Sequence, residues 1–510
     1  MPDVEPPLTA SSQKSEKSER ADDDKQSVKS GKSGKSPGGS RAGSAKSGKS
    51  ARSTASTTKT KSGAASPAPS IHDDPIGDMR NMRRIIAEDP EWSLATVPLL
   101  SDLCIKHVVG NFEFNSKILN DLLLKHKTKV LERIATCLPL KVTALLVEDE
   151  GYWKRCCKAR WDICDVSAYG DSWKRMYFER NLENIIEHFV PEQTNDTELK
   201  EVLPLSANYV QRLNIKQLLP PVKEVKGLED DTSDAGSDAG DGPETDHFDF
   251  ATVLQGLPNL VEFRVTYGVK DCGMNFEWNL FQFTARDCLL LAKCIANCKQ
   301  LKVFQLHRSK VDDDKVRVLI SHILDHPGLE ELDLSHNVIS DRGARAIGKF
   351  LNNHSKLVKL NVCDNQVRAA GAMAIAHALT KNSTLETLNL RLNRLGDEGG
   401  QAICRALLKN STLKEINLGS NDMTEPTAAI LSQVITQNQT ITSLDLSCNR
   451  PGPDGGKQLQ EGMEENTTIV TMDLRLTECG QESEYCINQI LAKNQDRARE
   501  AALNEQNAKR

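Results

Sequence analysis

The chain has 510 residues, of which 65 are Lys or Arg and 71 are Asp or Glu, for a formal net charge of −6. This length predicts more than one domain, and so small a net charge singles out no class of partner. No apolar run approaches the roughly 20 residues of a membrane span, and the first residues lack a signal-peptide pattern, so we expect an intracellular protein.

The first segment, residues 1–71, is rich in Ser, Lys and Gly and nearly free of large apolar side chains. Such a composition buries too little surface to offset the entropy of ordering, which predicts a disordered basic tail. Within it Gly43–Ser50 fits the phosphate-loop pattern GxxxxGK[ST]. That motif needs a buried strand before it and a helix after it, and the flanking residues favour neither. A solvated tail that is phosphorylated or touches an acidic surface is the better interpretation.

Residues 72–221 have apolar residues at helical spacing, which predicts an all-α domain. Helices are expected over 79–86, 94–112, 118–124, 130–138, 142–146, 152–161 and 173–189. The segments 152–161 and 173–180 are dense in aromatic residues and Arg, as a nucleic-acid face would be. Because the domain has no strong excess of basic over acidic residues, we favour a helical core over which the aliphatic parts of Arg and Lys side chains lie.

The 14 cysteines include no CxxC pair, as expected in a reducing compartment. Cys156, Cys157 and Cys164 cluster, but their spacing suits no common zinc site, so buried thiols are the better interpretation. Residues 222–249 are acidic and Gly-rich, which predicts a flexible loop. Their spacing does not match a calcium-binding EF-hand loop.

From residue 329 to 477 one phrase returns every 28 residues, starting at 329, 357, 385, 413, 441 and 469. Weaker copies start at Leu260 and Leu301, and the longer spacing between these two predicts an insertion. The phrase LxxLxLxxN is typical of leucine-rich repeats. Its Leu-x-Leu pair predicts a strand with one buried face, and its Asn should bond backbone groups at the turn after the strand.

The remainder of each unit, such as 343–351, has the spacing of a helix that packs behind the strand. A 28-residue unit holds a full helix. We therefore predict an α/β leucine-rich-repeat solenoid, a ribonuclease-inhibitor-like horseshoe, over residues 250–480. Residues 481–510 should form a capping helix, over 482–491, and a charged C-terminal tail, helical or frayed, over 494–510.

Two polar patterns in the repeats have structural interpretations. The glycosylation-like sequences at Asn382, Asn410 and Asn466 occupy equivalent helix-to-strand turns, so turn chemistry explains them. The carboxylates of 311–315 lie at a strand-to-helix turn, where Asp caps helices, and capping is favoured over a metal site.

Alternation along the strands places a column of polar residues on the concave face. These are Asp333, Ser335, Asn361, Asn389, Arg391, Asn417, Asp445, Asp473 and Arg475. A merely solvated face would also be polar, but repeat scaffolds usually present extended protein-binding surfaces. We predict that this column binds protein, and we find no catalytic, cofactor-binding or metal-binding constellation in the sequence.

Four segments carry a resemblance to a known family: 83–94, 173–183, 270–280 and 309–315. Over residues 78–500 the chain closely resembles leucine-rich-repeat subunits of the nexin–dynein regulatory complex, in particular the subunit 5 family. The resemblance implies a structural subunit of the assembly that links neighbouring doublet microtubules in motile cilia and sperm flagella and restrains dynein-driven sliding.

The same resemblance implies no enzyme activity and no cofactor. It implies as partners the other subunits of that complex, including a second leucine-rich-repeat subunit, and contact with axonemal doublet microtubules through the complex. Nucleic acid and membrane are not expected partners. The implied location is the cytoskeleton of a motile cilium or flagellum.

Two alternatives from other functional classes stay open. Leu138-Pro139, the aromatic segment 152–161 and the order of helical domain then repeats are distantly similar to F-box substrate receptors of ubiquitin ligases. GTPase activators of the Ran type also use long leucine-rich repeats and need a catalytic Arg or Asn on an early repeat turn. Arg308 is the nearest candidate for that role.

Overall fold

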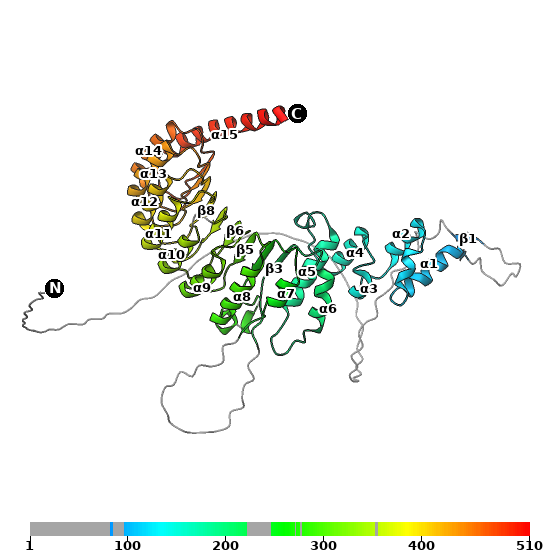
Figure 1. Cartoon of the computed structure of the whole chain (residues 1–510). Helices are drawn as coiled ribbons and strands as arrows, with labels where there is room; N and C mark the ends of the chain where they lie inside the picture. Colours follow the sequence, from blue (N-terminus) through cyan, green and yellow to red (C-terminus); the bar gives the residue numbers. More distant parts are fainter. Residues whose placement is uncertain are drawn as a thin grey trace, which may run out of the picture. The chain divides into compact units, whose positions relative to one another are not determined.

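The computed structural model describes residues 82–84, 96–221, 246–270, 272–275, 278–351 and 355–509 (Figure 1). The basic tail, its Gly43–Ser50 pattern and residues 222–245 of the acidic loop lie outside the described residues. Among the helices that are described, none is long and apolar enough to cross a bilayer.

The helical region begins with a short hairpin-like pair rather than a helix. Met82–Arg84 form strand β1, antiparallel to β2, Thr96–Pro98. The helix expected over 79–86 is therefore wrong, and the one expected from 94 begins only at Leu100. Short apolar stretches do not distinguish strand from helix. Pro98 disfavours a helical conformation at the residue before it, and pairing across the two strands decides between the alternatives.

The other predicted helices of this region are present, with shifted bounds. They are α1 (Leu100–Gly110), η2 (Ser116–Asn120), α2 (Leu124–Arg133), α3 (Leu140–Thr143), α4 (Glu150–Arg160) and α5 (Trp173–Glu187). The short helix η3 (Ser167–Tyr169), between α4 and α5, was not expected. Helix α6 (Thr197–Ser206) follows them and was not expected.

The aromatic segments form a core, as the sequence favours. Trp153 is 1% exposed, its indole N–H donates to the carbonyl of Val147 at 2.9 Å, and its ring lies 5.3 Å from that of Phe178. The Arg180 guanidinium lies 4.6 Å from the centre of the Trp161 ring. Burial raises the pKa of the Cys157 thiol to about 12, which keeps it a protonated, inert thiol.

The solenoid is a parallel sheet of nine strands in the order β11-β10-β9-β8-β7-β6-β5-β4-β3. The strands are β3 (Arg212–Ile215), β4 (Glu262–Val265), β5 (Val303–Leu306), β6 (Glu331–Asp333), β7 (Lys359–Asn361), β8 (Thr387–Asn389), β9 (Glu415–Asn417), β10 (Ser443–Asp445) and β11 (Thr471–Asp473). From β6 onward neighbouring strands pair in a register of 28 residues, which confirms the predicted repeat.

Helices follow the strands and line the outer side of the coil, with the strands on the inner, concave side (Figure 1). They are α7 (Ala251–Gln255), α8 (Ala285–Asn297), α9 (Asp313–Ile323), α10 (Asp341–Phe350), α11 (Ala369–Leu379), α12 (Gly396–Leu407), α13 (Glu425–Gln437), α14 (Gly452–Glu464) and α15 (Gln481–Lys509). The described part of the insertion between β4 and α8 contains η4 (Gly273–Asn275) and η5 (Trp278–Phe281).

Strand β3 belongs to the sheet although it lies inside the range predicted to be helical, residues 72–221. The sheet thus begins at residue 212 rather than at 250. Val210, Leu213 and Ile215 do fit the LxxLxL half of the phrase, but Leu218 replaces its Asn, and the next copy starts 50 residues later at Leu260. Because this copy is incomplete and does not follow the 28-residue spacing, the sequence did not predict this first strand.

Buried Asn side chains join successive repeats, as predicted. The Asn365 amide donates to the carbonyls of Leu334 in the preceding repeat, at 3.0 Å, and of Val362 in its own, at 3.1 Å. Its oxygen accepts the N–H of Ile339 at 3.0 Å. Equivalent residues Asn337, Asn393, Asn421 and Asn449 donate in the same way. Each side chain therefore ties two repeats together through otherwise unpaired backbone groups.

A second row of buried Asn lies at the helix-to-strand turns. Asn382, Asn410 and Asn466 are 6%, 4% and 2% exposed, which confirms turn chemistry at the glycosylation-like sequences. Asn410 donates to the carbonyl of Leu379 at 2.9 Å, and its oxygen accepts the N–H of Leu413 at 2.9 Å. Asn438 and Asn494 continue the row at the same 28-residue spacing.

Helix α5 covers the free edge of β3 with three carboxylates, one on each successive turn. Glu179 accepts the N–H of Arg212 at 3.0 Å. Glu183 accepts the N–H of Asn214 at 2.8 Å, and Glu187 accepts the N–H of Lys216 at 2.7 Å. An uncovered edge would offer these groups to other chains, so the helix both continues the core and closes the sheet.

We predict that Asn365→Ala lowers the free energy of unfolding by about 2 kcal/mol, because the buried N–H of Ile339 loses its acceptor. Urea unfolding followed by circular dichroism measures the change. Asn504→Ala, the same change at an exposed position of α15, is the control and should have little effect. Equal effects of the two substitutions would contradict a structural role for the Asn row.

Glu183 predicts a pH dependence of stability. Burial, reinforced by the charges of Glu179 and Glu187, raises its pKa from 4.5 to about 8. The folded protein then holds this proton to higher pH than the unfolded chain does, so its stability falls as pH rises from 4.5 to about 8. Glu183→Gln keeps an acceptor for Asn214 without the charge. The melting temperature of this variant, relative to that of the wild type, should therefore increase as the pH rises across this range.

The control is Glu198→Gln, which removes the same charge from an exposed position of α6. It should follow the wild type at every pH. A Glu183→Gln curve that runs parallel to the wild type would show that burial of this carboxylate carries no cost.

Candidate protein-binding surface

The predicted column lies along the concave ends of six neighbouring strands. Its acidic and amide members are the last residues of their strands: Asp333 (β6), Asn361 (β7), Asn389 (β8), Asn417 (β9), Asp445 (β10) and Asp473 (β11). Arg391 and Arg475 lie two residues beyond β8 and β11. Ser335, also expected on this face, is only 4% exposed.

Each of these six residues also holds the turn that follows its strand. The side-chain oxygen accepts the backbone N–H of the residue two positions later, at 2.9–3.1 Å, in every case. This is the Asx-turn geometry that Asp and Asn favour. One oxygen of each side chain is thus occupied, and the surface offers a partner only the second oxygen or the amide N–H₂.

Side chains on the last repeats form a charged network across the strands. Asn417 donates to Asp445 at 2.7 Å, and the Arg391 guanidinium lies 3.7 Å from the same carboxylate oxygen. Arg475 donates to both oxygens of Asp473, at 2.9 and 3.0 Å, and this hydrogen bonding lowers the pKa of Asp473. The Arg475 side chain is 80% exposed and that of Arg391 is 36% exposed, so a partner can reach both.

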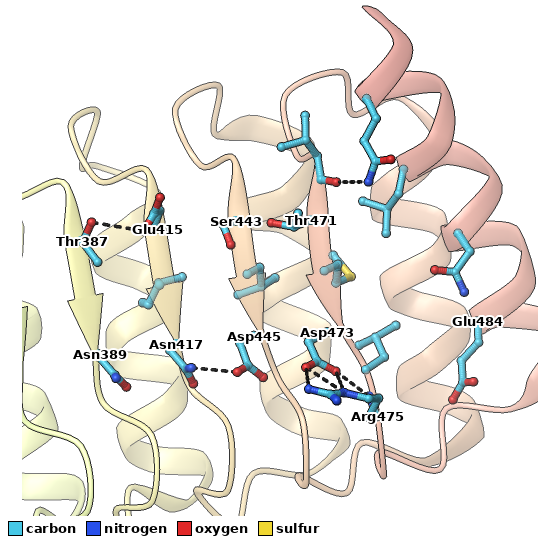
Figure 2. Close-up of a pocket in the computed structure, with 18 of the residues that line it drawn as sticks. Thr387, Asn389, Glu415, Asn417, Ser443, Asp445, Thr471, Asp473, Arg475 and Glu484 are labelled. Carbon is cyan, nitrogen blue, oxygen red and sulfur yellow. Dashed lines mark hydrogen bonds and ion pairs between the residues drawn. The ribbon is translucent and has the colours of Figure 1, made fainter. Parts of the chain in front are cut away.

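A groove of about 890 Å³ lies between the concave face of β8–β11 and helix α15. Figure 2 shows Asn389, Asn417, Asp445, Asp473 and Arg475 together along it. Asp333 and Asn361 are not among its lining residues and lie further along the sheet. The structure therefore concentrates five of the nine predicted residues in one hollow.

Other lining residues were not expected from the sequence. Glu415 and Thr387 face the groove at the first positions of their strands, and their side chains are hydrogen-bonded at 3.3 Å (Figure 2). Glu484 and Asn488 come from α15. Both residues lie in the range 482–491 where the sequence predicts a capping helix, and α15 runs on from there to Lys509. Asn494 stands 28 residues after Asn466 and marks a further repeat position.

The carboxylates of 311–315 cap helices, as predicted. Asp312 accepts the N–H of Lys315 at 2.9 Å and begins α9. Asp313 reaches the next repeat, where it accepts the N–H groups of Ser340 and Gly343 at 2.7 and 3.0 Å. Across the described residues, no group of three or more His, Cys, Asp and Glu side chains is arranged to hold a metal ion.

Comparisons with known proteins agree with the repeats. A leucine-rich-repeat family model matches residues 327–348, 353–376, 381–404, 409–425 and 437–459. Among solved structures, leiomodin-1 actin-binding site 2 matches 33% of this chain and 97% of its own, at 22% identity and a TM-score of 0.30. A likeness this low has no bearing on function.

Curated relatives carry more information. Dynein regulatory complex subunit 5 of Mus musculus is 54% identical over 278 residues, which is 54% of this chain and 56% of that protein. The protein of the same name from Chlamydomonas reinhardtii is 34% identical over 220 residues, 43% of this chain and 50% of that protein. The chain thus spans about half the length of the curated relatives that it matches.

Proposed function

We propose that this chain, a leucine-rich-repeat protein homologous to dynein regulatory complex subunit 5 over about half of its length, is a structural subunit of that complex. Its proposed location is the axoneme of motile cilia and sperm flagella. Identity of 54% over 278 residues is the observation that supports the proposal most. The proposed role is non-enzymatic: the protein binds other subunits and through them helps to restrain dynein-driven sliding of doublet microtubules.

The proposed mechanism is geometric. The two buried rows of Asn make the repeats stiff, so the concave face presents its side chains at fixed spacing to a partner subunit. A partner would meet the amide of Asn389 and the guanidinium groups of Arg391 and Arg475. It would also meet the carboxylates of Asp445 and Asp473, whose oxygens already accept hydrogen bonds within the surface. Charge-assisted hydrogen bonds of this kind give orientation and specificity, which a scaffold subunit requires.

Reversing both charges, with Arg391→Glu and Arg475→Glu, should weaken incorporation of the protein into the complex. Both substitutions place a carboxylate beside existing ones, Asp445 and Asp473, and remove the exposed donors. Recovery of the other subunits with the tagged protein, purified from flagella, measures incorporation. We expect a drop of about tenfold with an unchanged melting temperature.

The matched control reverses two exposed charges on the convex side, Arg317→Glu on α9 and Arg342→Glu on α10. Both guanidinium groups pair with the exposed Asp314, so this variant also loses surface ion pairs. It should assemble normally. Full assembly of the concave variant, or equal loss in the two variants, would refute the concave face as the docking surface.

One observation favours a second candidate, the F-box-like substrate receptor. Large apolar side chains of the helical region between residues 100 and 145 are exposed: Leu100 (76%), Phe114 (89%), Leu123 (74%), Leu124 (80%) and Leu145 (73%). Exposed apolar side chains are available to contact a partner, and an F-box-like receptor would need such a contact for its adaptor. For Arg308, the GTPase-activator candidate, the structure adds no such support.

The two candidates differ in which partner needs this region. An F-box-like receptor would co-purify with the ubiquitin-ligase adaptor, and Leu123→Asp with Leu124→Asp would abolish that association. A complex subunit would show no adaptor in the purified material. Recovery of the adaptor with the unmodified protein would reverse our preference.

A further inference from the structure

The two edges of the repeat sheet are treated differently. At β3, the carboxylates of α5 accept the edge N–H groups. At β11, the other edge, no strand follows and helix α15 runs alongside instead (Figure 2). The question is whether α15 satisfies the edge of β11 as α5 satisfies that of β3.

The preceding repeat shows what this edge lacks. There the N–H of Leu446 donates to the carbonyl of Asp473, and the N–H of Cys448 donates to that of Arg475, both at 2.9 Å. The equivalent residues 28 positions later are Leu474 and Leu476. Within the described part of the chain, neither of their N–H groups has a hydrogen-bond acceptor.

One backbone group on the same edge, the carbonyl of Val470, does have a hydrogen-bond partner. The carbonyl of Thr442 in β10's repeat accepts the N–H of Val470 at 2.9 Å. Its equivalent, the carbonyl of Val470, accepts the side-chain amide of Gln495 at 2.8 Å. A side chain of α15 thus takes the place of the next strand at this point. Further along the edge, Leu474 lines the groove, and Leu476 follows two residues later with an exposed side chain.

We propose that β11 and α15 form a docking groove in which an extended segment of a partner protein adds to the sheet as a further strand. Its carbonyls accept the N–H groups of Leu474 and Leu476, as strand addition at a sheet edge requires. The inference does not rest on the proposed function, because it concerns the sheet edge and not the column on the concave face.

The lining of the groove defines the chemistry of this segment. Side chains alternate along a strand, so one set faces inward and the other faces the concave side. The inward set meets Leu474, Leu491 and Ala492, which suits apolar residues. The other set meets Asp473 and Glu484, and since Arg475 already pairs with Asp473, the remaining charge is negative and suits Lys or Arg.

A peptide of about ten residues that alternates Val and Lys is the probe, and its Val–Glu counterpart is the charge control. With the full-length protein, the Val–Lys peptide should slow hydrogen exchange at the amides of Leu474 and Leu476 by about tenfold or more. The Val–Glu peptide should have no effect. Absence of binding by both peptides at millimolar concentration, or binding with unchanged exchange at these amides, would overturn the proposal.

Ala492→Trp fills the groove from its exposed helical wall, and Ala501→Trp places the same side chain on the same helix beyond the groove. The first should weaken binding of the Val–Lys peptide by about tenfold and the second should leave it unchanged. Equal effects would refute the site. So would amides of Leu474 and Leu476 already protected in a dimer of the free protein, because a second copy would then occupy the edge.

Discussion

The solenoid depends on one interaction, the buried side-chain amide of Asn at the end of each strand. The amide bonds the carbonyl of its own strand and that of the preceding repeat, as Asn365 does with Val362 and Leu334. A non-glycine residue with positive φ recurs just before it, at His336, Asp364 and Leu392. The amide satisfies the backbone where the chain leaves the strand, which lets an unfavourable turn conformation recur in every repeat.

This dependence explains which parts of the fold were predictable. The Asn bonds, the buried Leu positions and the helix spacing all recur at one period, so six copies in the sequence confirm each other. Strand β3 has only half of the phrase and breaks the period, and its pairing with β4 joins residues 50 apart. Likewise β1 is decided by its pairing with β2 and not by its own three residues. Contacts between distant segments leave no local pattern to read.

The candidate surface divides in the same way. Alternation in a strand places Asp445 and Asp473 on the concave face, which the sequence predicts. Their second role, holding the turn through the N–H two residues later, depends on backbone geometry and was missed. The helix over 482–491 was predicted, but its place as a wall of the groove was not, because the packing of α15 against β11 depends on contacts that the sequence of the helix does not show. Part of the column's polarity is therefore structural, and the exposed Arg391 and Arg475 are its better evidence for binding.

A solenoid has two ends, and each exposes a sheet edge that a stacked repeat would otherwise cover. At the first end the cost is met inside the chain, since burying Glu179, Glu183 and Glu187 against β3 satisfies its N–H groups even though burial raises the pKa of Glu183 to about 8. At the last end the side chains of Asn494 and Gln495 donate to carbonyls of Asn466, Ile469 and Val470, while the N–H groups of Leu474 and Leu476 have no acceptor among the described residues. Closure at one end and an edge with unpaired N–H groups at the other make the two ends of the described sheet chemically different.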